Sequence, residues 1–446
     1  MSLQPNLTAY IKNISAKNVR TFAAAAAAKT KDPQSEAVNF LPREDPKQTT
    51  CNGIAVASVE TNRPVSRLAV YIKAGSRYEQ PDKLGVVHAL RLAAGSTTKQ
   101  VTRIGIARNI DALGGNLTCT VGREHIAYTL EATRDKIGTL SKYLKEVSLN
   151  QAFKPWELQD NLPRLKDDLA SRPAEVRVLE AVHKAAFRRG LGYGLYSPKF
   201  RAGSVTTEEL QDYVRKNFVE ASVVGVGLSL EETANFAATL NISSRDRQLC
   251  PTKFGGGEYR KNKGGDLAYV AIVAEGASLS DPKQSVASAV AQRVLGSVSR
   301  AKRGVPAGKL ASLNGDSSAV NAITANYTDG GLFGIFIAAT SNVVGDATRK
   351  AVSVLRATTA NDTDVSRAKS SLKSDIAATL DSEANLVEEL GLRSLLTGRV
   401  NSVSEILQLV DSVTTADVNA ILTKGGGKLA LAAYGNIANV PYLDEL

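Results

Sequence analysis

The sequence predicts an α+β fold built from two homologous, duplicated domains, and two observations carry this prediction. The first is an internal repeat, because the stretch VTTEEL at 205–210 returns as VTTADV at 413–418. The second is the order of the expected elements: strands follow one another in pairs, and helices follow the pairs. That order lacks the regular strand–helix–strand alternation of a doubly wound parallel sheet, and so favours α+β.

The repeat extends well beyond one motif. Each copy of the motif places a threonine cap before a helical turn that carries an acidic residue. Three further pairs of segments match in the same order and at nearly the same spacing: 68–78 with 267–277, 128–133 with 335–340, and 222–227 with 430–435. Any one match is weak evidence, but four in one order indicate a duplicated domain.

The elements of the first half can be placed in order along the chain. Strands are expected at 53–60 and 67–74, helices at 84–94 and 102–113, and strands again at 116–120 and 125–132. Between the halves, residues 241–266 are rich in glycine and charge, which is typical of an exposed linker. The predicted domains therefore span 37–240 and 267–446.

The N-terminus has the composition of a mitochondrial presequence. Residues 1–31 contain five basic residues and no acidic one, and six consecutive alanines follow Phe22. Apolar residues at helical spacing lie opposite the lysines, as in an amphipathic transit peptide. We expect residues 1–22 to be a cleaved presequence, with a disordered tail reaching to about 36.

Composition excludes several classes of protein. The net charge is +11, but the basic residues form no arginine-rich helix and no patch interleaved with aromatic residues, so nucleic acid is not an expected partner. No apolar run approaches the length of a membrane span. The three cysteines, Cys51, Cys119 and Cys250, are far apart and include no C-x-x-C pair, which suits free thiols in a reducing compartment.

One expected helix resembles the metal-binding helix of zinc peptidases, but it lacks two of the three motif residues that bind zinc and activate water. Inverted zincins carry H-x-x-E-H, in which two histidines bind the metal and the glutamate activates water. Here His88 holds the first position, but Arg91 stands in place of the glutamate and Leu92 in place of the second histidine. An arginine cannot accept a proton and a leucine cannot bind zinc, and catalytic zinc normally needs three protein ligands.

Taken together, these features resemble the pitrilysin and mitochondrial processing peptidase family. Beside the motif at 88–92, the resemblance is carried by segments along nearly the whole chain: 52–57, 74–79, 112–116, 196–198, 326–334, 433–436 and 441–446. It implies two α+β domains in one chain that enclose a cleft. It also implies that a third ligand would lie near Asp168, although a solvated helix face is the expected role of Asp167 and Asp168. Ordinary core or surface roles are expected for His125 and His183.

The resemblance implies a noncatalytic function. The C-terminal segments resemble the core subunits of the mitochondrial ubiquinol–cytochrome c reductase complex (complex III), which implies a scaffold subunit without catalytic, cofactor-binding or metal-binding residues of its own. The alternative is the noncatalytic, substrate-binding subunit of the processing peptidase; the few glycines between 295 and 308 argue against it. Arg91 and Leu92 argue against a third possibility, an active zinc endopeptidase.

The expected surroundings follow from the same resemblance. The chain would lie on the matrix side of the inner membrane and attach to it only through partners. Those partners would be a homologous core protein 1, cytochrome b, cytochrome c1 and the Rieske subunit, which would carry the haem and iron–sulfur cofactors.

Overall fold

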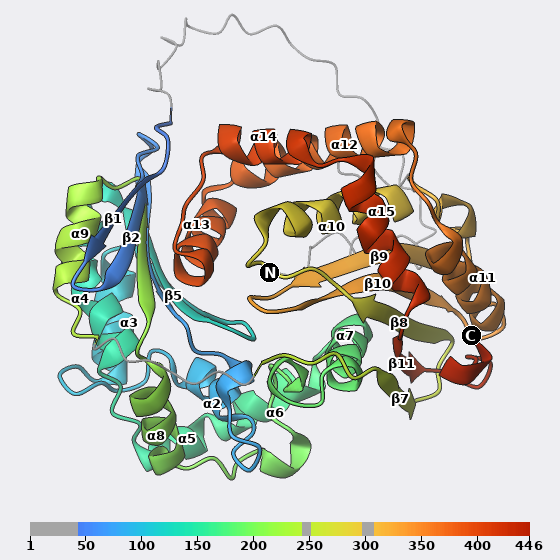
Figure 1. Ribbon diagram of the computed structural model, residues 1–446. Helices are drawn as coiled ribbons and strands as arrows, with labels where there is room; N and C mark the ends of the chain where they lie inside the picture. Colours follow the sequence, from blue (N-terminus) through green and yellow to red (C-terminus); the bar gives the residue numbers. More distant parts are fainter. Residues whose placement is uncertain (1–42, 243–250, 297–306) are drawn as a thin grey trace, which may run out of the picture.

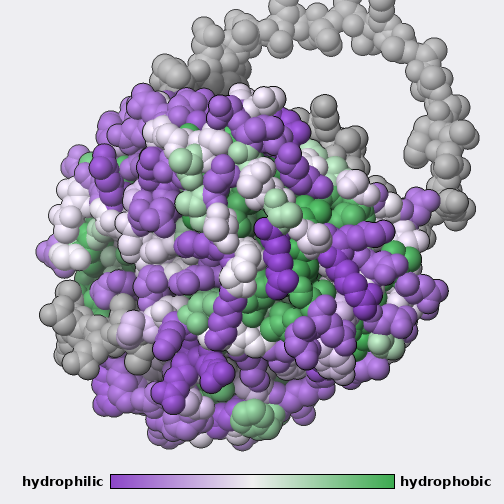
Figure 2. Space-filling view, turned by 45° about the vertical axis from the view of Figure 1, so that its right-hand side comes forward, coloured by the Kyte–Doolittle hydropathy of each residue, from purple (hydrophilic) through white to green (hydrophobic). Residues whose placement is uncertain are grey.

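The computed structural model describes residues 43–242, 251–296 and 307–446. The predicted presequence at 1–22 therefore lies outside the described residues. In the described part, no helix is long and apolar enough to cross a membrane. The face turned forward in Figure 2 is mostly hydrophilic, with a smaller hydrophobic area near its centre.

The first half is built on a six-stranded sheet with the strand order β1-β2-β6-β3-β5-β4. Only β2 and β6 run parallel; all other neighbours in this sheet are antiparallel. The strands are β1 (Lys47–Cys51), β2 (Ile54–Val59), β3 (Val65–Ile72), β4 (Asn116–Val121), β5 (Ile126–Thr133) and β6 (Ala221–Val226). The predicted strands of this half are confirmed, and the sheet gains the edge strand β1.

The second half repeats this topology in a five-stranded sheet ordered β7-β11-β8-β10-β9. Here β7 pairs in parallel with the last strand, β11, as β2 does with β6, and the other neighbours are antiparallel. The strands are β7 (Gly257–Asn262), β8 (Leu267–Glu275), β9 (Ser318–Asn326), β10 (Gly331–Thr340) and β11 (Ala430–Gly435). Since β2-β6-β3-β5-β4 and β7-β11-β8-β10-β9 have the same order and directions, the predicted duplication is confirmed.

One predicted boundary is wrong. The linker was placed at 241–266, but residues 257–262 form β7, which pairs with β11 over its whole length. Residues 243–250 of the predicted linker lie outside the described residues, whereas Gly257 and the charged residues of 258–261 belong to this edge strand. Its side chains are exposed or half-buried, so it lacks the apolar alternation that marks a strand in a sequence.

The helices predicted at 84–94 and 102–113 are confirmed as α2 and α3, and the described part of the first half has six more. The helices of this half are α2 (Val86–Ala93), α3 (Arg103–Ala112), α4 (Arg134–Leu149), α5 (Pro155–Asp160), α6 (Leu162–Ala170), α7 (Ala174–Ala186), α8 (Thr207–Asn217) and α9 (Leu230–Ala238). The first threonine of the repeated motif, Thr206, is the N-cap of α8, and its partner in the second half, Thr414, is the N-cap of α15.

The helices of the second half cover one face of its sheet and also extend to the first half. They are α10 (Pro282–Leu295), α11 (Val344–Ala357), α12 (Asp362–Leu380), α13 (Glu383–Thr397), α14 (Val403–Ser412) and α15 (Thr415–Thr423). A core of α10, α11, α12 and α15 packs on one face of the second sheet. The matching face of the first sheet is covered by α2, α4, α8 and α9.

The two halves exchange helices across their other faces. Helix α13, from the second half, packs Leu386, Val387 and Leu390 on the first sheet. Helix α7, from the first half, packs Val178 and Val182 on the second sheet. Figure 1 shows both crossings, with α13 beside the first sheet and α7 against β8 and β11. Neither sheet is therefore buried on both faces by its own half of the chain.

Candidate functional site

The helix that carries the degenerate motif is fixed at its start by a buried carboxyl group. Helix α2 begins after Gly85, whose φ of 89° lies in the left-handed region that favours glycine. Glu79 accepts hydrogen bonds from the backbone N–H groups of Gly85 (2.9 Å) and Val87 (2.8 Å). Burial raises the pKa of Glu79 to about 7, against the lowering effect of these two bonds. These two hydrogen bonds thus fix the first turn of α2, which carries His88.

His88 is buried, and both of its ring nitrogens are engaged. The backbone N–H of Ser197 donates to Nδ1 (3.2 Å), so the ring proton lies on Nε2 and is donated to Oδ2 of Asp168 at 2.7 Å. Burial lowers the pKa of His88, which keeps the imidazole neutral. The edge of its ring meets Tyr196, with 5.3 Å between ring centroids. No lone pair of this imidazole is left free for a metal.

Arg91 brings its positive charge to the same carboxylate. Its guanidinium contacts Oδ2 of Asp168 directly, and its Cζ lies 5.6 Å from the ring centroid of Tyr196. Asp168 is therefore shared between His88 and Arg91. At the position of the catalytic glutamate the chain has a cation, which cannot act as a base towards water.

Leu92 fills the place of the second histidine with an apolar contact. It is 7% exposed and packs against Leu165 and Leu169 of α6 in a small cluster. The structure sets these motif residues against one helix, α6, the region near which the resemblance implied a third ligand. Where the family would hold zinc, His88, Leu92 and Asp168 do not form a ligand set, and no catalytic step through a metal follows.

The predicted role of Asp168 is wrong. It was expected, with Asp167, to lie on a solvated helix face. Asp167 is exposed, but Asp168 is only half-buried and is turned towards α2, on the same side of α6 as Leu165. Residues three apart share a helix face, so the apolar position of Leu165 was the available signal.

The other candidate ligands do not assemble into a site. His125 and His183 are each 8% exposed, and burial lowers the pKa of both, to about 3 for His125. His183 contacts Tyr327 Oη at 2.8 Å. Cys51 and Cys119 are free thiols, and Cys250 lies outside the described residues. Among the residues that the structure describes, no three His, Cys, Asp or Glu side chains are placed to hold a metal ion.

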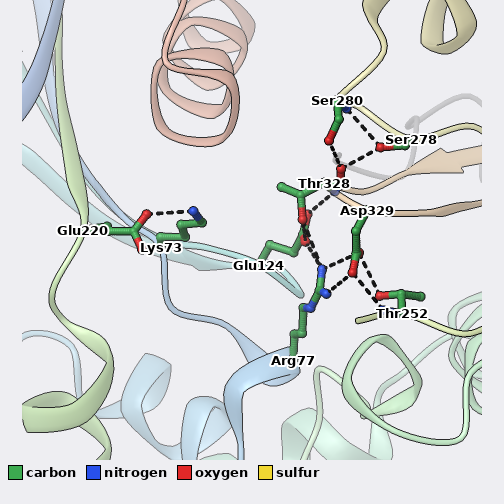
Figure 3. A network of polar contacts seen from close by, with 9 residues as sticks. All are labelled: Lys73, Arg77, Glu124, Glu220, Thr252, Ser278, Ser280, Thr328 and Asp329. Carbon is green, nitrogen blue, oxygen red and sulfur yellow. Dashed lines mark hydrogen bonds and ion pairs between the residues drawn. The ribbon is translucent and has the colours of Figure 1, made fainter. Parts of the chain in front are cut away.

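A second polar network joins the halves near this site, and sequence reasoning missed it (Figure 3). Arg77, from the loop after β3, contacts Glu124 of the β4–β5 turn at 2.5 Å and Asp329 of the β9–β10 turn at 2.5 Å. The side chains of Arg77 and Glu124 are each 3% exposed, so this pair is almost fully removed from water. Asp329 also accepts from Thr252, at 2.8 Å, in the segment between the halves. The network holds turns of both sheets together.

Comparison with known protein families agrees with the two-domain organisation of the chain. The family described as Insulinase (Peptidase family M16) matches residues 55–199, and the one described as Peptidase M16 inactive domain matches residues 200–372. The chain therefore belongs to peptidase family M16, and the predicted resemblance to the pitrilysin and processing peptidase family is confirmed.

Within this family the chain is similar to core protein 2 of complex III, as its C-terminal segments predicted. Over 415 residues it is 34% identical to "Cytochrome b-c1 complex subunit 2, mitochondrial" of Homo sapiens, covering 89% of this chain and 90% of that protein. The Rattus norvegicus protein of the same name is 34% identical over 447 residues, covering 96% and 98%. "Probable mitochondrial-processing peptidase subunit alpha-1, mitochondrial" of Arabidopsis thaliana is 28% identical over 418 residues, covering 89% and 83%.

Proposed function

We propose that this chain is a noncatalytic core subunit, core protein 2, of a mitochondrial cytochrome b-c1 complex. The likeness to the human and rat subunits supports the assignment to the complex. The observation that carries the noncatalytic role is the state of His88, whose nitrogens are both engaged, beside an arginine in the place of the catalytic base. The chain is a structural subunit whose surfaces contact other subunits, and those partners bind the cofactors.

The proposal extends to location and partners. The chain lies on the matrix side of the inner membrane, after removal of residues 1–22, and is held there by other subunits. These are a homologous core protein 1, cytochrome b, cytochrome c1 and the Rieske subunit, with the haem and iron–sulfur centres in the last three. The chain itself binds no cofactor.

A knock-out strain rescued with variants of this chain tests the proposal. Loss of the chain should destabilise the complex on native gels and abolish cytochrome c reduction by isolated membranes. Rescue with His88→Ala together with Arg91→Ala should restore both, because neither side chain takes part in quinol oxidation. Normal assembly of that variant without turnover would contradict the noncatalytic role.

The proteins that copurify with the chain separate the two noncatalytic functions. A tagged copy at its natural level should bring down haem-bearing cytochromes. Recovery of a processing-peptidase partner and presequence cleavage in place of haem would assign the chain to the alternative, the substrate-binding subunit suggested by the Arabidopsis relative.

A further inference from the structure

Five cations gather where the connection between α6 and α7 meets the edge of the second sheet. We call this group the basic junction; its members are Arg172, Arg177, Lys199, Lys261 and Lys263. The first three belong to the first half of the chain and the two lysines of β7 and its end to the second. In the part of the chain that the structure describes, none of the five forms an ion pair with a carboxylate. Because the five come from both halves, the cluster exists only when the halves are assembled.

The two arginines are held in place by neutral groups. Arg177 donates to three backbone carbonyls: from Nε to Arg172 at 3.0 Å, and from Nη2 to Leu169 at 3.2 Å and Ala170 at 2.9 Å. Arg172 donates from Nε to the carbonyl of Leu169 at 3.3 Å. These carbonyls lie at the end of α6 and just beyond it, where a helix leaves its acceptors unsatisfied. The bonds fix the guanidinium groups but leave their charge unpaired.

Two tyrosine rings, one from each half of the chain, lie against the two arginines of the basic junction. The Cζ of Arg172 lies 4.7 Å from the ring centroid of Tyr196, and the Cζ of Arg177 lies 6.0 Å from that of Tyr434. Tyr434 is in β11, directly opposite Lys261 of β7. The backbone N–H of Lys263 then donates to the carbonyl of Gly435 at 2.9 Å. The two lysines thus lie along the strand edge that Arg177 approaches.

The electrostatic surroundings of Lys261 are one-sided. Burial lowers its pKa, and the charges of Lys263, Lys199, Arg177 and Arg172 lower it further. Three acidic residues nearby are paired with other cations: Asp168 with His88 and Arg91, Glu180 with Arg123 at 3.1 Å, and Glu258 with Arg260 at 2.8 Å. Glu175, in the first turn of α7, forms no ion pair among the described residues; burial and its charge raise the pKa of Tyr269.

The chain pairs comparable cations elsewhere. Arg67, Arg134 and Arg201 each have a carboxylate oxygen within 2.6 Å. Gathering five like charges without such partners costs free energy through mutual repulsion, which an anionic ligand would relieve. In hydrogen bonds among the described residues Arg172 engages only Nε, so its two terminal nitrogens can bind both oxygens of one carboxylate at once, whereas Arg177, with Nε and Nη2 engaged, offers Nη1.

We propose that the basic junction is a docking surface for an acidic segment of a partner polypeptide. The segment would lay aspartate or glutamate side chains across the edge of β7 and the α6–α7 connection, bridging both halves. Because Arg172 stacks on the same Tyr196 ring as Arg91, the bound segment would pass beside the degenerate motif. The same charge would repel a basic peptide from this surface. The proposal stands on the junction alone and does not depend on which complex contains the chain.

Peptide binding to the purified full chain tests the proposal. The probes are three fluorescent peptides of one length, built on Asp and Glu, on Asn and Gln, or on Lys, at 50 and 200 mM salt. The acidic peptide alone should bind, and its affinity should fall about tenfold or more between the two salt concentrations, because the contact is electrostatic. Equal binding of the neutral peptide, or preference for the basic one, would overturn the proposal.

A matched pair of variants separates the junction from net charge. Lys261→Gln with Lys263→Gln should weaken acidic-peptide binding about tenfold, since two charge contacts with the peptide are lost. Lys99→Gln with Lys350→Gln removes the same charge from exposed positions outside the junction and should change the affinity less than twofold. Equal weakening by both pairs would show a general charge effect and overturn the proposal. Junction-dependent binding to anionic vesicles without peptide binding would also overturn it, in favour of a lipid surface.

Discussion

His88 on α2 and Asp168 on α6 are 80 positions apart in the chain, yet 2.7 Å separates Nε2 of the imidazole from Oδ2 of the carboxylate. The pair joins the first position of the degenerate motif to the region where the resemblance placed a third metal ligand. What remains of the site is therefore a hydrogen-bonded contact between two helices, with Arg91 as its cation. This contact does not bind a metal. We expect it to stabilise the fold, because it joins α2 to α6.

Removal of Asp168 should destabilise the protein far more than removal of its neighbour. Asp168→Ala leaves the buried Nε2–H of His88 without its acceptor and Arg91 without its carboxylate, a loss of about 1–3 kcal/mol in the free energy of unfolding. Asp167→Ala, on the exposed side of the same helix, should cost less than about 0.5 kcal/mol. Urea unfolding of both variants measures the difference, and equal effects would mean that the His88 contact contributes nothing.

Zinc binding should be absent from the natural chain and recoverable by two substitutions. Arg91→Glu with Leu92→His restores the motif, and imidazoles four residues apart share a face of α2, towards Asp168. Metal analysis after dialysis should find no stoichiometric zinc in the natural protein and about one zinc per chain in the double variant. His88→Ala added to the double variant should abolish binding. Tight zinc in the natural protein, lost on His88→Ala, would contradict this account.

Local sequence patterns predicted the parts of the fold that depend on local order. The repeated threonine caps, the strand pairs and the motif at His88 all appear where they were expected, because caps and apolar periodicity are properties of neighbouring residues. The exchange of α7 and α13 could not be predicted in this way. Each helix shows an apolar face in the sequence, but nothing in that face specifies which of two similar sheets it covers.

The polar contacts between distant segments were missed for a related reason. Arg77, Glu124 and Asp329 stand in loops and turns among other polar residues, where charges are usually solvated. Arg77 and Glu124 become buried, and Asp329 becomes their more exposed partner, only when the turns of both sheets meet. The role of Asp168 was missed likewise, since its partners come from another helix. The duplicated topology could therefore be predicted from the sequence, whereas the contacts between the two halves could not.

Helix α13 offers a direct test of the exchange between the halves. At an ordinary helical position Gly→Ala stabilises by about 1 kcal/mol. A Cβ at Gly391, however, would lie 2.2 Å from the buried ring of Tyr71 in the first sheet, so Gly391→Ala should instead destabilise by about 1–3 kcal/mol. Gly138→Ala in α4 is the matched control, because nothing lies within 4 Å of its added Cβ, and it should raise the melting temperature. Stabilisation by both substitutions would contradict the packing of α13 on the first sheet.

Glu79 should make the stability of the protein depend on pH. Its pKa is about 7 in the folded protein and 4.5 for an unperturbed glutamate, so between these values the folded state binds more protons than the unfolded one. The free energy of unfolding therefore falls as the pH rises through this window. By pH 8 the carboxyl group is ionised in both states, and the cost of burying its charge is fully present. That cost reaches at most about 3 kcal/mol, from 1.36 kcal/mol per pKa unit.

Comparison of Glu79→Gln with the natural protein isolates this contribution, because the other titrating groups are common to both chains. The glutamine retains one acceptor for the N–H groups of Gly85 and Val87 but carries no charge. It should therefore be less stable than the natural protein at pH 5, where the folded-state carboxyl group is protonated and can still accept. The difference should shrink or change sign by pH 8, as the natural protein alone acquires a buried anion. Denaturant unfolding at pH 5, 6, 7 and 8 measures this trend. A difference that instead grows with pH would show that the two backbone hydrogen bonds outweigh burial, and that Glu79 holds the start of α2 as an anion throughout.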